Sequence, residues 1–140
     1  MTELVRIESD GILYAQIIRH SYRADGVDFV TEPKDSQQVA YMSHKKGYII
    51  DAHYHNTKKR VIYKTQEVLI VKRGKLRCDI YDNKQVLIDS TLLEEGDLII
   101  LLDGGHGFAA IEDIELIEIK QGPFLGAEDK TRFTQHSTIE

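Results

Sequence analysis

The sequence predicts an all-β protein with an antiparallel sandwich or barrel, and three observations lead to this prediction. Short runs rich in β-branched and aromatic residues recur along the 140-residue chain, and many of them alternate apolar with polar residues. Turn signals separate these runs at intervals of about ten residues, which is typical of antiparallel sheets. Ten glycines against two prolines favour tight turns over disorder. One hydrophobic core is sufficient at this length, so residues 1–140 are expected to form a single domain.

The expected strands follow from the apolar runs. In chain order they are residues 12–18, 27–30, 39–42, 48–55, 67–73, 75–82, 86–93, 97–102, 108–111 and 114–120. The first of them belongs to a group of N-terminal strands within residues 3–35, although residues 14–24 also fit a short helix. The tail, residues 126–140, is polar, and its last residues are expected to be loosely held.

Composition and charge exclude several classes of protein. The chain carries 18 basic and 23 acidic residues, a net charge of −5, and it has no basic stripe of the kind that nucleic acids require. Charges throughout residues 1–20 and the lack of a long apolar run predict a cytoplasmic protein with neither signal peptide nor membrane span. Cys78 is the only cysteine, and its place in an alternating run predicts a half-buried structural thiol.

The run GYIIDAHYHN, residues 47–56, contains two histidines separated by one tyrosine. On a strand, His53 and His55 would project from the same face, because residues two apart share a face. Neutral imidazoles bind first-row divalent metals, but a pair alone is more often a solvated strand face. Later in the chain, Glu67 opens the strand pattern EVLIVKR, and His106 follows another strand pattern and its turn, GDLIILLDGGH. A carboxylate plus imidazoles from different strands is a common transition-metal ligand set.

Three spaced motifs carry a resemblance to a known family. These are G-x5-H-x-H at residues 47–55, E-x6-G at 67–74 and G-x5-L-D-G-G-H at 96–106. In this order they resemble the two signature motifs of the cupin superfamily, over residues 40–120. The resemblance implies a jelly-roll β-barrel in which one divalent ion (Mn, Fe, Ni, Co or Zn) is bound by His53, His55, Glu67 and His106.

The chain departs from the family pattern at two places. Eleven residues separate His55 from Glu67, which implies an enlarged hairpin. Leu102 stands where the family usually has proline, and His106 comes one residue early, so regular alternation would turn it outward. Gly104 and Gly105 form a flexible turn that lets His106 face inward all the same. Because a strand pattern rather than a helix follows, Gly104, Gly105 and Gly107 are interpreted as turn glycines and not as a phosphate-binding loop.

Longer phrases, including KTQEVLIVKRGKLRCDIYD and IELIEIKQGPFLGAEDKTRF, are similar to small cupins of bacterial surface-polysaccharide and nucleotide-sugar gene clusters. This similarity implies a carbohydrate-derived ligand and metal-dependent isomerase or epimerase chemistry. Two alternatives stay open: a metal-free sugar ketoisomerase with His53 and His55 as acid and base, and a cupin that binds its ligand without turning it over. A homodimer is expected, because an open jelly roll leaves edge strands that pairing would cover.

Four further residues are candidates for contact with the ligand. If Glu118 and Lys120 face the barrel interior, they supply a general acid/base and a cation for an anionic substrate. If they face outward, they belong to a solvated strand face. Arg60 and Tyr63 lie in the enlarged hairpin, where they either bind substrate as part of a lid or belong to a solvated loop.

Overall fold

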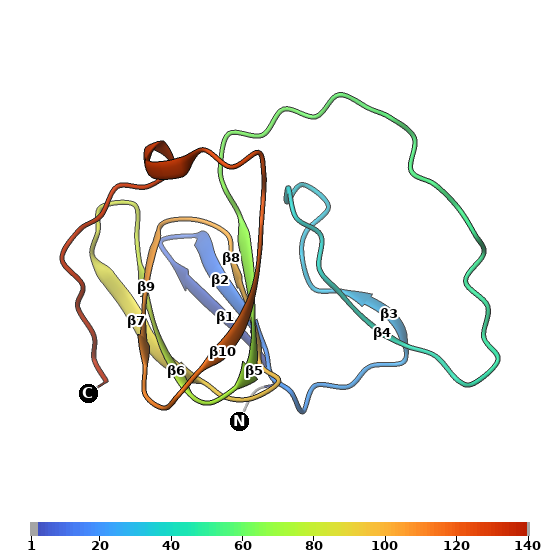
Figure 1. The fold of residues 1–140 in the computed structure, drawn as a ribbon, viewed down its shortest axis with the longest axis horizontal. Coiled ribbons are helices and arrows are strands. Elements are labelled where there is room, and N and C mark those ends of the chain that lie inside the picture. Colours follow the sequence, from blue (N-terminus) through green and yellow to red (C-terminus); the bar gives the residue numbers. More distant parts are fainter. Residues whose placement is uncertain (1–2, 140) are drawn as a thin grey trace. The chain divides into compact units, whose positions relative to one another are not determined.

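The structure, a computed structural model, describes residues 3–139 (Figure 1). These residues form ten β-strands and one short 3-10 helix, η1 (Gly126–Asp129), so the all-β prediction is confirmed. No helix in this part of the chain is long and apolar enough to cross a membrane. The chain divides into two compact units, and the boundaries fall at Tyr22/Arg23 and at Lys64/Thr65. The expectation of a single domain stays a prediction.

The larger unit, which holds everything outside residues 23–64, contains two antiparallel sheets. The first has the strand order β1 (Leu4–Ser9), β2 (Ile12–Ile18), β8 (Leu98–Leu101), β5 (Glu67–Arg73) and β10 (Glu115–Lys120). The second has the order β7 (Leu87–Leu93), β6 (Leu76–Tyr81) and β9 (Gly105–Ala110). Among the described residues no strand ladder joins the two sheets into a closed barrel. The jelly-roll barrel therefore stays a prediction.

The hydrophobic core lies between the two sheets. Leu69 and Val71 of β5 and Ile99 of β8 contribute from the first sheet, and Cys78 and Ile80 of β6 contribute from the second. Their alternation with outward residues is the period-two pattern visible in the sequence. Cys78 is fully buried instead of half-buried, and this burial, followed by the nearby carboxylates, raises the pKa of its thiol. A thiol held in its neutral form is a packing residue, not a nucleophile.

The strand register fixes which polar side chains share the core face. Glu67 pairs with Leu101 and Lys120 pairs with Glu67, while Glu118 pairs with the core residue Leu69. On the second sheet, His106 pairs with the core residue Ile80. Directly opposed residues of a ladder point to the same face. All four side chains therefore point to the inner side of their sheets.

The smaller unit consists of a two-stranded hairpin and a long segment without regular structure. Strands β3 (Gly26–Phe29) and β4 (Ala40–Ser43) pair antiparallel, and the Val30 amide prolongs the ladder by donating to the Val39 carbonyl at 3.0 Å. Residues 44–64 form no strand, so the strand expected at 48–55 is wrong. The alternating pattern is there, but a strand forms only where another strand pairs with it. Tyr48 instead stacks on His44, with ring centroids 4.1 Å apart.

Candidate functional site

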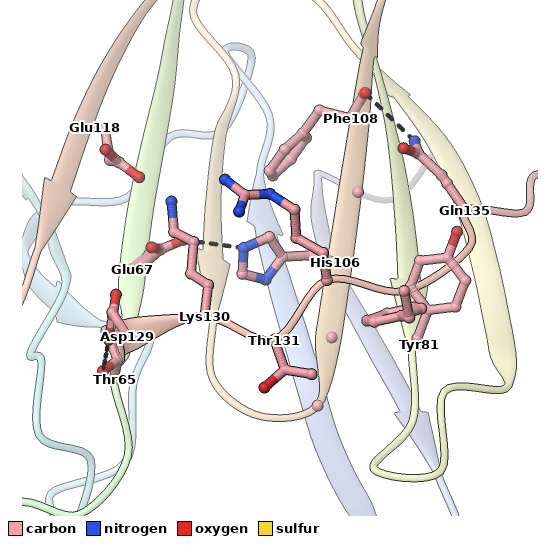
Figure 2. Close-up of a pocket in the computed structure, with 15 residues that line it drawn as sticks. Thr65, Glu67, Tyr81, His106, Phe108, Glu118, Asp129, Lys130, Thr131 and Gln135 are labelled. Carbon is pink, nitrogen blue, oxygen red and sulfur yellow. Dashed lines mark hydrogen bonds and ion pairs between the residues drawn. The ribbon is translucent and has the colours of Figure 1, made fainter. Parts of the chain in front are cut away.

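The larger unit contains a cavity of about 580 Å³ that is lined by residues of β5, β9, β10 and the C-terminal segment (Figure 2). Its charged and titratable lining residues are Glu67, His106, Glu118, Asp129, Lys130 and Arg132. Phe108 and Phe133 add aromatic surface to the lining. A volume of this size fits a small molecule, and a mixed lining of rings and converging polar groups is typical of ligand sites.

Glu67 and His106 form the centre of this lining. The Nε2 atom of His106 lies 3.1 Å from Oε2 of Glu67, across the two sheets. Only 8% of the Glu67 side chain is exposed, whereas 33% of the His106 side chain is. Because a carboxylate only accepts, Nε2 carries the proton, and Nδ1 is left to interact with a ligand. The sequence singled out both residues, and the structure places them together.

The electrostatic state of Glu67 follows from its neighbours. The hydrogen bond with His106 lowers the pKa of Glu67, burial opposes this, and the charges of His106, Lys120 and Lys130 lower it further. The net result is a pKa below the ordinary value for glutamate. Glu67 is therefore ionised at neutral pH, which suits a group that orients an imidazole rather than one that delivers a proton.

Glu118 and Lys120 lie on the inner face of β10. The sequence had left open whether they face inward or outward. Glu118 is exposed and belongs to the lining, on the strand next to the one that carries Glu67 (Figure 2). The Lys120 ammonium lies 3.9 Å from the carboxylate of Asp129, which also accepts from the Thr65 hydroxyl at 3.4 Å. Lys120 is thus partly neutralised. Its contact with Asp129 fixes the start of the C-terminal segment.

The C-terminal segment, residues 129–139, forms one wall of the cavity and then continues over the outer face of β6 and β9. Phe133 packs edge-to-face on Tyr81, with ring centroids 4.9 Å apart. Gly105 and Gly107 leave room for the side chains of the segment. A Cβ on Gly105 would lie 2.8 Å from the Phe133 ring. A Cβ on Gly107 would lie 2.8 Å from the Gln135 side chain. Their interpretation as turn glycines is wrong, since both lie within β9.

Gly104 alone fits the turn interpretation. Its φ of +66° is the left-handed conformation that glycine tolerates, and a Cβ there would lie 2.2 Å from the Tyr81 carbonyl oxygen. Strand β9 starts at the next residue, so His106 faces inward from a regular ladder and not from a flexible turn.

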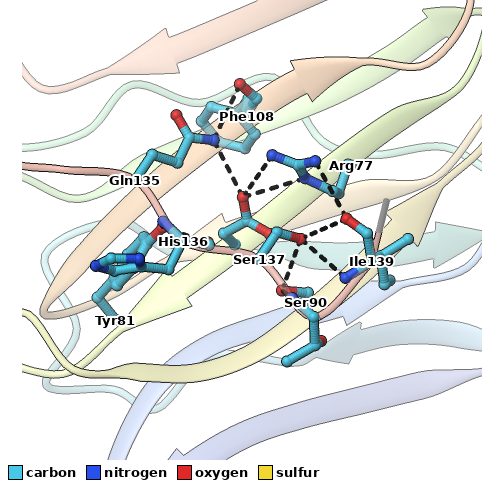
Figure 3. A network of polar contacts seen from close by, with 10 residues as sticks. Arg77, Tyr81, Ser90, Phe108, Gln135, His136, Ser137 and Ile139 are labelled. Atoms are coloured by element: carbon cyan, nitrogen blue, oxygen red, sulfur yellow. Dashed lines mark hydrogen bonds and ion pairs between the residues drawn. The ribbon is translucent and has the colours of Figure 1, made fainter.

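A buried polar network fastens the end of the segment to the sheet (Figure 3). Asp79 of β6 is fully buried and accepts from Gln135 Nε2 at 3.0 Å and from Arg77 Nε at 3.2 Å. The Ser90 hydroxyl accepts from Ser137 Oγ at 3.2 Å and from the Thr138 amide at 3.0 Å. The last residues described are therefore held by side chains of β6 and β7, contrary to the loose tail expected from the sequence.

The protonation state of Asp79 keeps this network in place. Burial alone would raise the pKa of Asp79, but the hydrogen bond from Gln135, the nearby hydroxyl groups of Ser90 and Ser137 and the charge of Arg77 together hold it below the ordinary value. An ionised carboxylate accepts several hydrogen bonds at once, as this one does.

The histidines of the predicted pair lie in the smaller unit. His53 and His55 are neighbours there, with ring centroids 5.4 Å apart and edge-to-face, but both are exposed and neither is on a strand. His53 Nδ1 lies 2.7 Å from the backbone oxygen of Asp51. Arg60 and Tyr63 belong to the same irregular segment, and Tyr63 is 95% exposed. All four residues are exposed and lie outside regular secondary structure.

The ligand set for a metal ion is incomplete within the larger unit. Glu67 and His106 supply one carboxylate and one imidazole, fewer donors than transition-metal sites in proteins have. Across residues 3–139 no group of three or more His, Cys, Asp or Glu side chains is close enough together to hold an ion. The residues that the structure brings together do not by themselves fit a resident metal.

A second cavity, of about 560 Å³, is also in the larger unit, and its buried carboxylate, Asp97, already has several partners. Asp97 accepts from Arg19 Nη1 at 3.0 Å, from the His20 amide at 2.9 Å and from the Glu94 amide at 2.8 Å. These bonds join the end of β2 to the turn before β8. We interpret the cluster as structural.

Sequence reasoning missed the contribution of the C-terminal segment. Lys130, Arg132 and Phe133 line the cavity, although the tail carries no apolar periodicity. The signal present was the run EDKTRF, in which two cations at alternate positions precede an aromatic residue. Only the glycine-lined face of β9 and the Asp79 network explain why this run is held against the site.

Comparison with known proteins finds no match among protein-family models, curated proteins or solved structures. What the fold and the site define is an all-β protein with a polar, partly aromatic cavity built around a carboxylate–imidazole pair. Membership of the cupin superfamily stays a resemblance carried by the three motifs.

Proposed function

We propose that the chain is a cytoplasmic protein that binds a small carbohydrate-derived ligand in the cavity and acts on it as a sugar isomerase or epimerase. The observation that carries this proposal is the Glu67–His106 pair, 3.1 Å apart, on the wall of a cavity of small-molecule size. Hydroxyl-rich ligands suit a lining in which carboxylates, an imidazole and aromatic rings converge. The resemblance of the motifs to small cupins of polysaccharide gene clusters supports the same ligand class.

The pair fits a proton-transfer role, with different tasks for its members. Isomerases and epimerases move a proton to and from a carbon or oxygen of the substrate, and imidazole is the side chain best suited to do so near neutral pH. His106 is the accessible member, and its Nδ1 atom is the one not directed at Glu67. Glu67 orients the ring by accepting the hydrogen bond from Nε2. Glu118, exposed on the same inner face, is the second candidate acid or base.

A non-catalytic binding protein is the second candidate. The carbohydrate ligand would then sit in the same cavity, and Glu67 and His106 would only hydrogen-bond its hydroxyl groups. Lys130 and Arg132 are exposed in the cavity lining, where they could contact a ligand in a binding protein as well as in an enzyme.

The experiment measures binding and turnover together. A panel of sugars, sugar phosphates and nucleotide sugars is screened by thermal shift and calorimetry, and each compound that binds is followed for isomerisation by NMR. The parent is compared with Glu67→Gln and His106→Asn, and with Glu112→Gln as a control that removes an exposed carboxylate outside the cavity lining. Binding without product identifies a binding protein. No binding by any compound, or equal binding and turnover in the His106 variant, refutes a site at this cavity.

A divalent metal is a separate part of the proposal. The resemblance assigns its binding to His53, His55, Glu67 and His106, and two of these donors already lie together. If all four coordinate one ion, it would polarise a ligand carbonyl or hydroxyl as a Lewis acid. The acid/base roles given above to His106 and Glu67 would then be replaced by coordination, so metal analysis decides between the two forms of the proposal.

We further propose a homodimer. Strands β1, β10, β7 and β9 each pair on one side only among the described strands, and unpaired edges favour association between chains.

A further inference from the structure

We infer that the ligand of the cavity carries an anionic group, a phosphate or a carboxylate, and that Lys130 and Arg132 of the C-terminal segment bind it. This inference deepens the proposed function, because it rests on the same cavity and adds a charge to the ligand class. It rests on the positions of these two cations, which form no ion pair with a carboxylate of the described residues and to which the sequence pattern assigned no role.

Lys130 and Arg132 are not neutralised by carboxylates of the described residues. Within residues 3–139, neither Lys130 nor Arg132 is within ion-pairing distance of a carboxylate. Both are exposed residues of the cavity lining. Lys130 is nevertheless near the carboxylate–imidazole pair, since its charge acts on Glu67 and its side chain reaches toward that pair in Figure 2.

The charges of the cavity lining are unevenly distributed. Asp129 lies 3.9 Å from Lys120, and Glu67 accepts a hydrogen bond from His106 at 3.1 Å. The carboxylates of Glu67 and Glu118 lie on the strands, whereas Lys130 and Arg132 lie on the C-terminal segment. Positive charge is therefore concentrated on one wall of the cavity in a chain whose net charge is −5, and such a local field selects anions.

The segment that carries Lys130 and Arg132 is fixed on both sides of them. Before them, Asp129 is bound by Thr65 and Lys120. After them, Phe133 packs on Tyr81, and Gln135 donates to Asp79 at 3.0 Å. The three residues between these anchors need little ordering when a ligand binds, which favours affinity.

The chemistry of the two side chains names the ligand group. The Arg132 guanidinium presents a planar fork of donors that matches two oxygens of a phosphate or carboxylate, and Lys130 adds a compact charge. An uncharged sugar uses neither feature. The ligand of highest affinity is therefore an acidic sugar, a sugar phosphate or a nucleotide-linked sugar.

The test compares matched ligands on matched variants. Glucose is compared with glucose 6-phosphate and with glucuronate by calorimetry at low salt, so that the phosphate and carboxylate arms are separate. The variants are Lys130→Gln, Arg132→Gln and the double variant, with Lys84→Gln as a control that removes an exposed cation in the β6–β7 turn. Inorganic phosphate is titrated in parallel, and the backbone amides of residues 129–133 are followed by NMR.

The expected result is that the parent binds at least one of the two anionic sugars about tenfold or more tightly than glucose. Each single variant should lose about five- to tenfold of that preference, the double variant should lose all of it, and Lys84→Gln should lose none. Phosphate should shift the amides of residues 129–133 in the parent and not in the double variant.

Two results overturn the inference. One is glucose binding as tightly as both anionic sugars, which leaves the proposed carbohydrate site standing. The other is an amide spectrum that phosphate does not change. If phosphate shifts these amides but no sugar of any kind binds, the anion subsite is established and the proposed carbohydrate function fails.

Discussion

The carboxylate of Glu67 and the imidazole of His106 meet at 3.1 Å, although 38 residues lie between them in the chain and they come from different sheets. Strand β5 presents Glu67 and strand β9 presents His106, each on the inner face of its sheet. Their contact joins the cavity faces of the two sheets. Both stability and function should therefore respond to changes in either residue.

Glu67→Gln should destabilise the protein by about 1–3 kcal/mol at pH 7, because it removes the charged partner of a largely buried hydrogen bond. The pKa of Glu67 is lowered in the folded protein, so its contribution is fully present above the ordinary glutamate pKa and is lost as the pH falls through the folded value. Urea unfolding of the parent and the variant between pH 7 and pH 3 measures this. A difference that stays constant down to pH 3 would contradict the assignment.

Asp79→Asn should release the C-terminal segment. The variant keeps the shape of the side chain but loses the charge that binds Arg77 and accepts from Gln135. We expect a loss of about 1–3 kcal/mol and faster hydrogen exchange in residues 133–139. Since the pKa of Asp79 is also lowered, acid should release the segment in the parent as the pH falls through that value. Exchange that stays slow in the variant would show that other contacts hold the segment.

A double-mutant cycle tests the close approach of Gly107 and Gln135. Gly107→Ala should cost about 1 kcal/mol, because the new methyl group would lie 2.8 Å from the end of the Gln135 side chain and would displace it from its hydrogen bond with Asp79. In a Gln135→Ala background most of that cost should disappear, which gives a coupling of about 0.5–1 kcal/mol. Denaturant midpoints of the four proteins measure it. Additive effects would mean that the segment does not lie on β9 in solution.

Metal content decides between the two forms of the proposed function. Protein purified without a histidine tag or a nickel column should contain close to one equivalent of a divalent transition metal, and His55→Ala should lose it, if the residues of the resemblance act together. Elemental analysis of both proteins gives the answer. A parent that stays free of metal after soaking would leave His106 and Glu67 as a metal-free acid/base pair.

The oligomeric state tests the unpaired sheet edges. Light scattering at micromolar concentration should give twice the mass of one chain. Ile119→Lys places a charge on β10, a strand that is unpaired on one side, where Ile119 is 48% exposed, and it should shift the equilibrium toward monomer if this strand is in the interface. A monomeric parent at all concentrations would refute the dimer.

The sequence by itself determined the all-β class and the position of most strands. Glu67–Arg73 was predicted with the bounds that the structure has, because apolar alternation and a glycine turn both depend on local residues. Glu67 and His106 were expected to lie together because of the resemblance to cupins, and the structure has them 3.1 Å apart. The prediction of a strand at 48–55 was wrong because it depends on a distant partner. Alternation shows that a segment can form a strand, but the strand forms only where another strand pairs with it.

Only the tertiary structure decided how the cavity is built. The inward direction of Glu118 and Lys120 depends on the register of β10 against β5, which leaves no trace in a single alternating run. The tail became part of the site because two glycines of β9 leave room for Phe133 and Gln135 and because a buried carboxylate on β6 binds its end. These are contacts between residues far apart in the chain, and a polar tail read alone carries no periodic pattern that would reveal them.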